Sequence, residues 1–365
     1  MADFKDELSP ELVRSLATDL ARAWDGFDPE RFIALAVDGL EALEMKARIR
    51  HIAAALAACM PPDAHDAASA IRTALANEGL GGWASQPVDE YVATTMIDRP
   101  DVGLGLLADL TSRHTAEFAI REFIDKQHDV AMRHLRAWTT HPDEHVRRLV
   151  SEGTRPRLPW GQRLTRFIDD PAPALRLLDE LFDDESLYVR RSVANHLNDV
   201  SKDHPELARA TARRWAAAST HGDFVARHGL RTLVKRGDAE ALGILGFDPD
   251  AVIAVDGVRC SPTEIEIGEE IVIELALTAE TDVRAVVDYV VHHQGAHGPK
   301  PGKAFTLSVR TLAAGERVVL VRRHRFAHVA SRRIHPGPHR IEIQVNGRVR
   351  SSLEVTVTET TARAR

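Results

Sequence analysis

HPDEHVRRLVSEGT (residues 141–154) and DDESLYVRRSVANHLND (residues 183–199) are two similar blocks, and RPRLPWGQRL (155–164) lies between them. When Val146 is aligned with Val189, the VRR triplets of the two blocks coincide at an offset of 43 residues. A period of roughly 40–47 residues is typical of HEAT and armadillo repeats. The two blocks therefore predict successive units of a helical repeat.

Helical spacing of apolar residues extends over most of the chain before this stretch and continues after it. Ser9 and Pro10 fit the N-cap and first position of a helix, and a third repeat-like match begins at Val225. Residues 79–92 are expected to form a looser connection because they are rich in glycine and contain a proline. The expected helices are 8–24, 27–43, 44–60, 64–78, 101–110, 115–125, 129–138, 205–218 and 223–237. Residues 1–248 are therefore predicted to be an all-α HEAT-like solenoid with a concave surface.

The apolar pattern changes after residues 247–262, which we interpret as a domain boundary. Short segments in which apolar and polar residues alternate follow, separated by Gly, Pro or Asn turns. They are 264–279, 284–294, 303–312, 316–326, 339–347 and 351–358. This spacing predicts an all-β immunoglobulin-like sandwich over residues 249–365, with a frayed tail at 361–365.

The composition is ordinary for a globular protein, with 44% hydrophobic and 28% charged residues. Cys59 and Cys260 are the only cysteines and lie far apart, which argues against a disulfide framework or a cysteine zinc site. No apolar run reaches the roughly 18 residues of a membrane helix. The acidic N-terminal stretch differs from a secretory signal. We expect a monomeric cytoplasmic, nucleoid-associated protein with no membrane contact.

Positive charge is concentrated in two regions although the net charge is −7. Residues 284–350 hold 13 Lys and Arg against three acids, and residues 144–166 hold six arginines against two glutamates. Such polarity would orient the molecule on a polyanion such as DNA. Chance clustering on solvated surfaces is the alternative interpretation.

Several of these segments resemble the AlkC family of bacterial DNA alkylation repair glycosylases. The resemblance is carried by VRRLVSEGTRPRLPWG (146–161) and YVRRSVANHLNDVSKDHP (188–205), and it extends to EFAIREFI (117–124) and LEALEMKARIRHIA (40–53). It covers most of the chain. Some members of that family are similar also in carrying an Ig-like domain after the helical one. The resemblance implies excision of N-methylated bases from duplex DNA without full base flipping. It also implies that residues 1–248 are the DNA-binding and catalytic domain and that residues 249–365 clamp the DNA.

Carboxylates are the candidate catalytic groups. A base methylated at a ring nitrogen is cationic and leaves as a neutral molecule, so no general acid is needed, whereas a carboxylate near C1′ stabilises the developing positive charge and orients water. The resemblance implies Glu152 as this carboxylate, with Glu117 and Asp199 at further active-site motif positions. Arg148 is four residues before Glu152 and is expected to form an ion pair that keeps it ionised. Each acid also fits a solvated helix-surface charge.

Trp160 lies between Pro159 and Gly161 in a predicted loop. A loop tryptophan can pack on a cationic base or on deoxyribose. The alternative is a core side chain between two repeats.

Basic residues near this loop are candidate phosphate ligands, since phosphates are bound without sequence preference. Those in the helical region are Arg155, Arg157, Arg163, Arg190, Arg191, Lys202 and His204. In the sandwich, HHQGAHGPKPGK (292–303) is a loop without large apolar residues, and its His292, His293, Lys300 and Lys303 are candidate DNA contacts. AlkC proteins with an Ig-like domain are similar in having a His-His loop there. A solvated stripe of arginines is the alternative.

No cofactor is expected, because no Gly-rich phosphate loop or dinucleotide fingerprint occurs. Zinc binding by His292, His293 and His297 is disfavoured, because no cysteine or carboxylate pattern accompanies them. The resemblance thus implies a monofunctional DNA glycosylase that acts on 3-methyladenine above all, with 3-methylcytosine and 1-methyladenine as further candidate substrates. A non-enzymatic repeat scaffold for a protein partner, and a damage-binding protein without catalysis, are the competing hypotheses.

Overall fold

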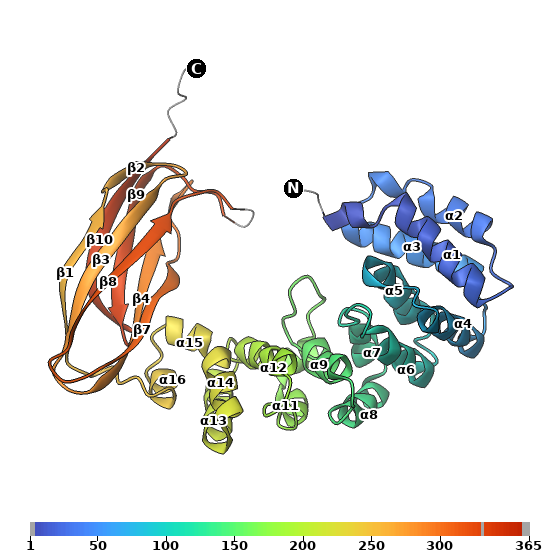
Figure 1. Cartoon of the computed structure of the whole chain (residues 1–365), viewed down its shortest axis with the longest axis horizontal. Coiled ribbons are helices and arrows are strands. Elements are labelled where there is room, and N and C mark those ends of the chain that lie inside the picture. The colour runs from blue at the N-terminus through green and yellow to red at the C-terminus, as the bar shows by residue number, and fades with distance from the viewer. Residues whose placement is uncertain (1–3, 330–331, 360–365) are drawn as a thin grey trace. The chain divides into compact units, whose positions relative to one another are not determined.

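The computed structural model describes residues 4–329 and 332–359. The chain is helical first and then formed of strands, as Figure 1 shows. The expected tail at 361–365 lies outside the described residues. Two compact units are defined by internal contacts, one formed by Met1–Asp203 with Ser219–Val225 and the other by His204–Ala218 with Ala226–Arg365.

The helices of the first unit pack on their neighbours in sequence and on the next but one. For example, α3 packs on α2 and α5, and contacts three helices apart also occur, as between α9 and α12. The elements are η1 (Phe4–Glu7), α1 (Pro10–Ala23), α2 (Pro29–Val37), η2 (Leu40–Ala42), α3 (Met45–Cys59), α4 (Ala64–Ala76), η3 (Gly82–Ala84), α5 (Ser85–Thr95), α6 (Pro100–Leu110), α7 (Ile120–Lys126), α8 (His128–Trp138), α9 (Glu144–Gly153), α10 (Thr165–Asp169), α11 (Ala172–Leu178) and α12 (Leu187–Val200). Then come α13 (Pro205–Ala218), α14 (Thr220–Gly229), α15 (Arg231–Lys235) and α16 (Ala239–Ile244).

Local signals place several helix ends where the sequence predicts them. The Ser9 side chain accepts a hydrogen bond from the backbone N–H of Leu12, and Pro10 is the first residue of α1. The expected helix over 27–43 ends early, at Val37, because Gly39 adopts a left-handed conformation with φ 70°.

Two expectations for the N-terminal helices were wrong. Residues 85–95 form α5 rather than a loose connection, and Pro87 is tolerated because it lies in the first turn, where its missing N–H costs nothing. The helix expected over 115–125 begins only at Ile120, so Glu117 lies in the turn before α7.

The strands form two facing sheets around one apolar core. Their orders are β1-β3-β8 and β2-β10-β9-β4-β7, and the short β5-β6 pair is separate. The strands are β1 (Ile253–Ser261), β2 (Glu264–Glu266), β3 (Glu270–Ala279), β4 (Val283–His292), β5 (Gln294–Gly295), β6 (Gly298–Pro299), β7 (Lys303–Leu312), β8 (Arg317–Arg325), β9 (Gly337–Val345) and β10 (Arg348–Thr358). This is the predicted sandwich.

Two details of the sandwich differ from the prediction. The boundary segment 247–262 contains a full strand, β1, which pairs with β3. The segment 264–279 is divided between the two sheets as β2 and β3. Cys260 is a free, buried thiol, as the lone cysteine of this region requires.

Candidate functional site

Helices α9 and α12, which contain the two aligned VRR triplets, share three local features. Val146 and Val189 are both buried, and each helix is capped by a side chain, from Asp143 for α9 and from Ser186 for α12. The first arginine of each VRR triplet folds back on the preceding turn. Arg147 Nη1 donates to the carbonyls six and five residues before it, and the corresponding arginine of α12 does the same. That arginine therefore shapes the repeat.

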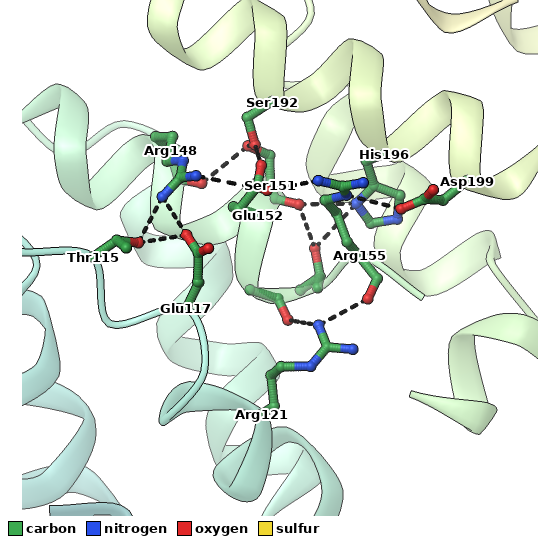
Figure 2. Close-up of polar contacts among 12 residues, drawn as sticks. Thr115, Glu117, Arg121, Arg148, Ser151, Glu152, Arg155, Ser192, His196 and Asp199 are labelled. Atoms are coloured by element: carbon green, nitrogen blue, oxygen red, sulfur yellow. Dashed lines mark hydrogen bonds and ion pairs between the residues drawn. The ribbon is translucent and has the colours of Figure 1, made fainter. Parts of the chain in front are cut away.

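Glu152 lies in the last turn of α9 with only 5% of its surface exposed. Its Oε1 accepts from Arg155 Nη1 at 2.7 Å, and its Oε2 accepts from Ser192 Oγ of α12 at 2.6 Å. The predicted Arg148 partner is present but more distant, at 3.6 Å. Figure 2 shows these contacts. Charged and hydroxyl donors thus fix both carboxylate oxygens.

Glu117 is held by the neighbouring arginine. Arg148 Nη1 donates to Glu117 Oε2 and, at 2.6 Å, to Thr115 Oγ1, and Thr115 Oγ1 also donates to Glu117. The Arg148 guanidinium lies over the Tyr188 ring, 5.1 Å from its centroid. Arg148 therefore joins Glu117 to Glu152 (Figure 2).

Arg155 differs most from its expected role as a phosphate ligand. It is 7% exposed, and its Nε donates to Asp199 Oδ2 at 2.8 Å while its Nη1 binds Glu152. Burial opposes its charge, but Glu152 and Asp199 outweigh burial and raise the pKa of the guanidinium. Asp199 is also bound by Lys202 Nζ at 2.7 Å. The acids and bases thus alternate from Glu117 to Lys202.

One pocket of about 370 Å³ brings predicted catalytic residues together. Glu117, Glu152 and Trp160 all line it, and so does Arg155; we call it the carboxylate pocket. Asp199 is not among its lining residues. The other lining residues are Met45, Trp83, Gln86, His114, Phe118, Leu158 and Pro159.

Trp160 is 66% exposed, so it is a surface side chain and not a core residue between repeats. Its φ is +64°, a left-handed conformation that non-glycine residues rarely adopt. Lys46 Nζ donates to its carbonyl oxygen. Strain of this kind persists where the surroundings impose it.

Arg121 imposes the path of this loop and was missed as a site residue. It is 1% exposed, and its guanidinium donates to the carbonyl oxygens of Gly153 and Arg155, both at 2.8 Å, and of Gln162 at 2.9 Å. The first two carbonyls lie at the C-terminus of α9, where carbonyls lack helical partners. Burial, and then the charge of Arg155, lowers the pKa of Arg121 to about 10. An arginine inside the apolar stretch AIREFI was the available signal.

His114 is a further lining residue that the sequence did not single out. Its Nδ1 lies 2.8 Å from Gln86 Nε2, an amide donor that also reaches the carbonyl oxygen of Thr115. Nδ1 is therefore the acceptor, and the ring proton is on Nε2. Burial lowers the pKa of His114, although Glu117 acts in the opposite direction, so the ring is neutral at pH 7.

The other predicted DNA ligands of the helical region differ in accessibility. Arg191 and Lys202 are exposed, whereas Arg157 forms a two-bond pair with Asp203, both bonds being 2.7 Å. His204 and Arg163 are half-buried and exposed respectively. Arg190 is bound to backbone carbonyls, so of the VRR pair in α12 only the second arginine has an exposed side chain.

The predicted DNA ligands of the sandwich also differ in accessibility. Lys300 and Lys303 are exposed, and His292 Nε2 lies 3.2 Å from the Glu342 carboxylate. His293 is only 2% exposed and packs against aromatic and histidine rings of the core. Burial, and then nearby positive charge, lowers its pKa to about 3. Its placement in the core does not fit a DNA contact.

Within residues 4–329 and 332–359, no cluster of His, Cys, Asp or Glu has the arrangement of a metal site. No helix in the same residues is both long and apolar enough to cross a membrane.

Together, the fold and the site define a protein in which a stacked helical region carries a carboxylate pocket and an Ig-like domain follows. Residues 254–359 match the model of the C-terminal Ig-like domain of the uncharacterised protein YhaZ. YhaZ of Bacillus subtilis (strain 168) is 33% identical over 359 residues, which are 98% of this chain and 100% of YhaZ.

A solved structure is also similar over the same length. The alkylpurine DNA glycosylase AlkC of Pseudomonas fluorescens, bound to DNA containing an abasic site analog, is 33% identical with a TM-score of 0.93. The match covers 98% of this chain and 100% of that one. The chain belongs to the AlkC family, as the sequence motifs predicted.

Proposed function

We propose that this protein is a DNA glycosylase that hydrolyses the N-glycosidic bond of cationic N-methylated bases in duplex DNA. 3-Methyladenine is the leading substrate, and 3-methylcytosine and 1-methyladenine are further ones. The observation that carries the proposal is the carboxylate pocket, in which Glu117 and Glu152 are held by arginines beside the exposed Trp160. The full-length similarity to an alkylpurine DNA glycosylase supports it.

The reaction suits carboxylates that remain ionised. The methylated base leaves C1′ with the bonding electron pair and becomes neutral, while positive charge develops on the sugar. Water adds to C1′ and transfers its proton to a carboxylate, which leaves an abasic site. No proton has to reach the departing base, so an acid of the kind used in most glycoside hydrolysis is unnecessary.

We assign the roles by position. Glu152 stabilises the sugar cation and orients water, since both its oxygens are fixed and it lines the carboxylate pocket. Glu117 contributes a second negative charge from the same pocket. Asp199 acts through Arg155, because it contacts that guanidinium and does not line the pocket. Arg148 holds both glutamates.

Trp160 supplies an aromatic face for the cationic lesion. Cations are attracted to the faces of aromatic rings, and this indole is largely exposed. We propose that cleavage occurs without full extrusion of the nucleotide, so that the sugar, and not the whole nucleoside, reaches the carboxylates.

DNA is held through phosphates by exposed basic residues. Arg191, Lys202 and Arg163 are the accessible candidates of the helical region, and Lys300 and Lys303 those of the sandwich. Each phosphate contact lowers log K by about 0.9 per unit of log salt concentration. Arg191→Gln is expected to reduce that slope by roughly one, with equal effects on different sequences.

The test is release of 3-methyladenine from methylated duplex DNA by the whole protein, measured together with the salt dependence of duplex binding. We expect base release without strand scission, since a monofunctional enzyme leaves the abasic site intact. Binding that is insensitive to salt, or absent, would favour a scaffold for a protein partner. Salt-dependent binding without base release would leave only a damage-binding protein.

A further inference from the structure

A larger pocket of about 640 Å³ adjoins the carboxylate pocket. We call it the Asp89 pocket. The two pockets share the lining residues Met45, Gln86, Phe118 and Trp160. The volume of the Asp89 pocket lies in the range of roughly 300–1,000 Å³ that is usual for small-molecule sites. The assigned catalytic roles use the first pocket only.

Asp89, in α5, lines this pocket and has no partner to explain its burial. It is 4% exposed, and neither of its carboxylate oxygens has a hydrogen-bond partner among the residues that the structure describes. Burial raises the pKa of its carboxyl group well above the ordinary value. A buried polar group without a partner is costly, so its presence needs an explanation.

A carboxyl group that carries its proton offers one donor and one acceptor side by side. The amino group and adjacent ring nitrogen of an aminopurine present the complementary pair. Both Asp89 oxygens are shielded from the pocket in this structure. Pairing with a ligand therefore requires the carboxyl group to turn about its Cβ–Cγ bond, a torsion with a broad distribution.

The rest of the lining fits a flat, uncharged heterocycle better than a nucleotide. Phe118 and Trp160 supply aromatic surface. Three acidic side chains, Glu44, Glu90 and Glu122, line the pocket against two basic ones, Lys46 and Arg50, so its net charge disfavours a phosphate. The ammonium of Lys46 is bound to the Trp160 carbonyl oxygen.

We propose that the Asp89 pocket binds the excised base as a neutral aminopurine, with the Asp89 carboxyl group pairing with its amino group and adjacent ring nitrogen. This rests on the proposed function, since the base must first be released in the neighbouring carboxylate pocket. The pocket then removes the product from C1′ and disfavours the reverse reaction.

Binding of free bases at pH 7, measured by calorimetry on the whole protein, tests the proposal. The wild type should bind 3-methyladenine more tightly than unsubstituted purine, which lacks the amino donor. Asp89→Leu should weaken 3-methyladenine binding about tenfold or more, because a buried hydrogen-bond pair is lost. Asp89→Asn should bind within a few-fold of the wild type, since an amide also offers a donor and an acceptor.

A second variant guards against a local folding effect at Asp89. Ile49→Trp narrows the pocket from α3 and should also weaken binding. Wild-type protein that binds no aminopurine, or Asp89→Leu protein that binds it as well as the wild type, would overturn the proposal.

The Glu152→Gln variant distinguishes failure of the proposed glycosylase function from failure of the proposed aminopurine binding. This variant should bind 3-methyladenine like the wild type while losing base release from DNA. Free-base binding by a wild type that releases no base would reject the glycosylase function and leave the pocket as an aminopurine site.

Discussion

Replacing Arg155 with Met should be among the most damaging single changes in the helical unit. The guanidinium is 7% exposed and makes bonds of 2.7 and 2.8 Å to Glu152 and Asp199. Removing one partner of a buried ion pair costs about 3–5 kcal/mol, because the charge that remains is uncompensated. Asp199 keeps Lys202, and Glu152 keeps a serine hydroxyl, so we expect about 3–5 kcal/mol in all, not twice that value.

Arg157→Met is the matched control. Arg157 also forms a two-bond pair with an aspartate, but its side chain and that of Asp203 are 27% and 25% exposed. An accessible pair contributes about 1 kcal/mol or less. The free energy of unfolding is measured in urea by tryptophan fluorescence, and four of the chain's five tryptophans lie in the first unit.

Equal destabilisation by Arg155→Met and Arg157→Met at pH 7 would refute the account of Arg155 as the buried link between the acids. Loss of DNA affinity without loss of stability would restore its expected role as a phosphate ligand.

Three further predictions concern the loop, the buried acid and the sandwich. Arg121→Met should slow base release by roughly tenfold or more and change the fluorescence emission of Trp160, because the backbone carbonyls that Arg121 binds beside the loop lose their donor. Unchanged kinetics and emission would contradict a positioning role for Arg121. Asp89→Leu should raise the melting temperature, because an unpartnered buried carboxyl is replaced by an apolar group, and a fall by several degrees would mean that Asp89 has a partner. His293 and His324 have pKa values lowered to about 3 and about 4, so as the pH falls the unfolded chain binds protons before the folded one does. The stability of the sandwich should therefore be constant above pH 7 and fall between pH 6.5 and 4, by about 2 kcal/mol per histidine at pH 5. Thermal unfolding followed by the circular dichroism of the β-strands measures this, and a melting curve that does not change with pH would contradict it.

Features set by local sequence could be predicted. The 43-residue offset of the VRR triplets, the Ser9-Pro10 helix start and the alternating strands all depend on neighbours in the chain, and the structure has them. The α5 helix was missed because residues 79–92 were expected to form a looser connection, although a proline in the first turn is compatible with a helix.

Side-chain partners across stacked helices could not be predicted in the same way. The i, i+4 spacing gave the Arg148–Glu152 pair, but at 3.6 Å it is the weaker one. Arg155, which forms the shorter 2.7 Å bond to Glu152, lies only three residues further along the chain. The other short contacts, of Arg148 with Glu117 and of Glu152 with Ser192, come from other segments. Such contacts depend on how the helices stack and not on local spacing.

Burial of polar residues was also beyond the sequence. Asp89 and His293 have neighbours that allow either an exposed or a buried position, and both are buried. Arg121 lies in an apolar stretch, but its three carbonyl partners are on a distant segment. Because burying these polar side chains costs free energy, their positions point to structural or functional roles that the sequence alone does not reveal.

The rate of 3-methyladenine release from methylated duplex DNA under single-turnover conditions, compared for wild type, Glu152→Gln and Glu144→Gln, tests the central claim most directly. Glu144 is an exposed carboxylate in the first turn of the same helix. We predict that Glu152→Gln is slower by a factor on the order of 100 or more, because the charge facing the sugar cation is lost, and that Glu144→Gln equals the wild type. Full activity of Glu152→Gln would contradict the account.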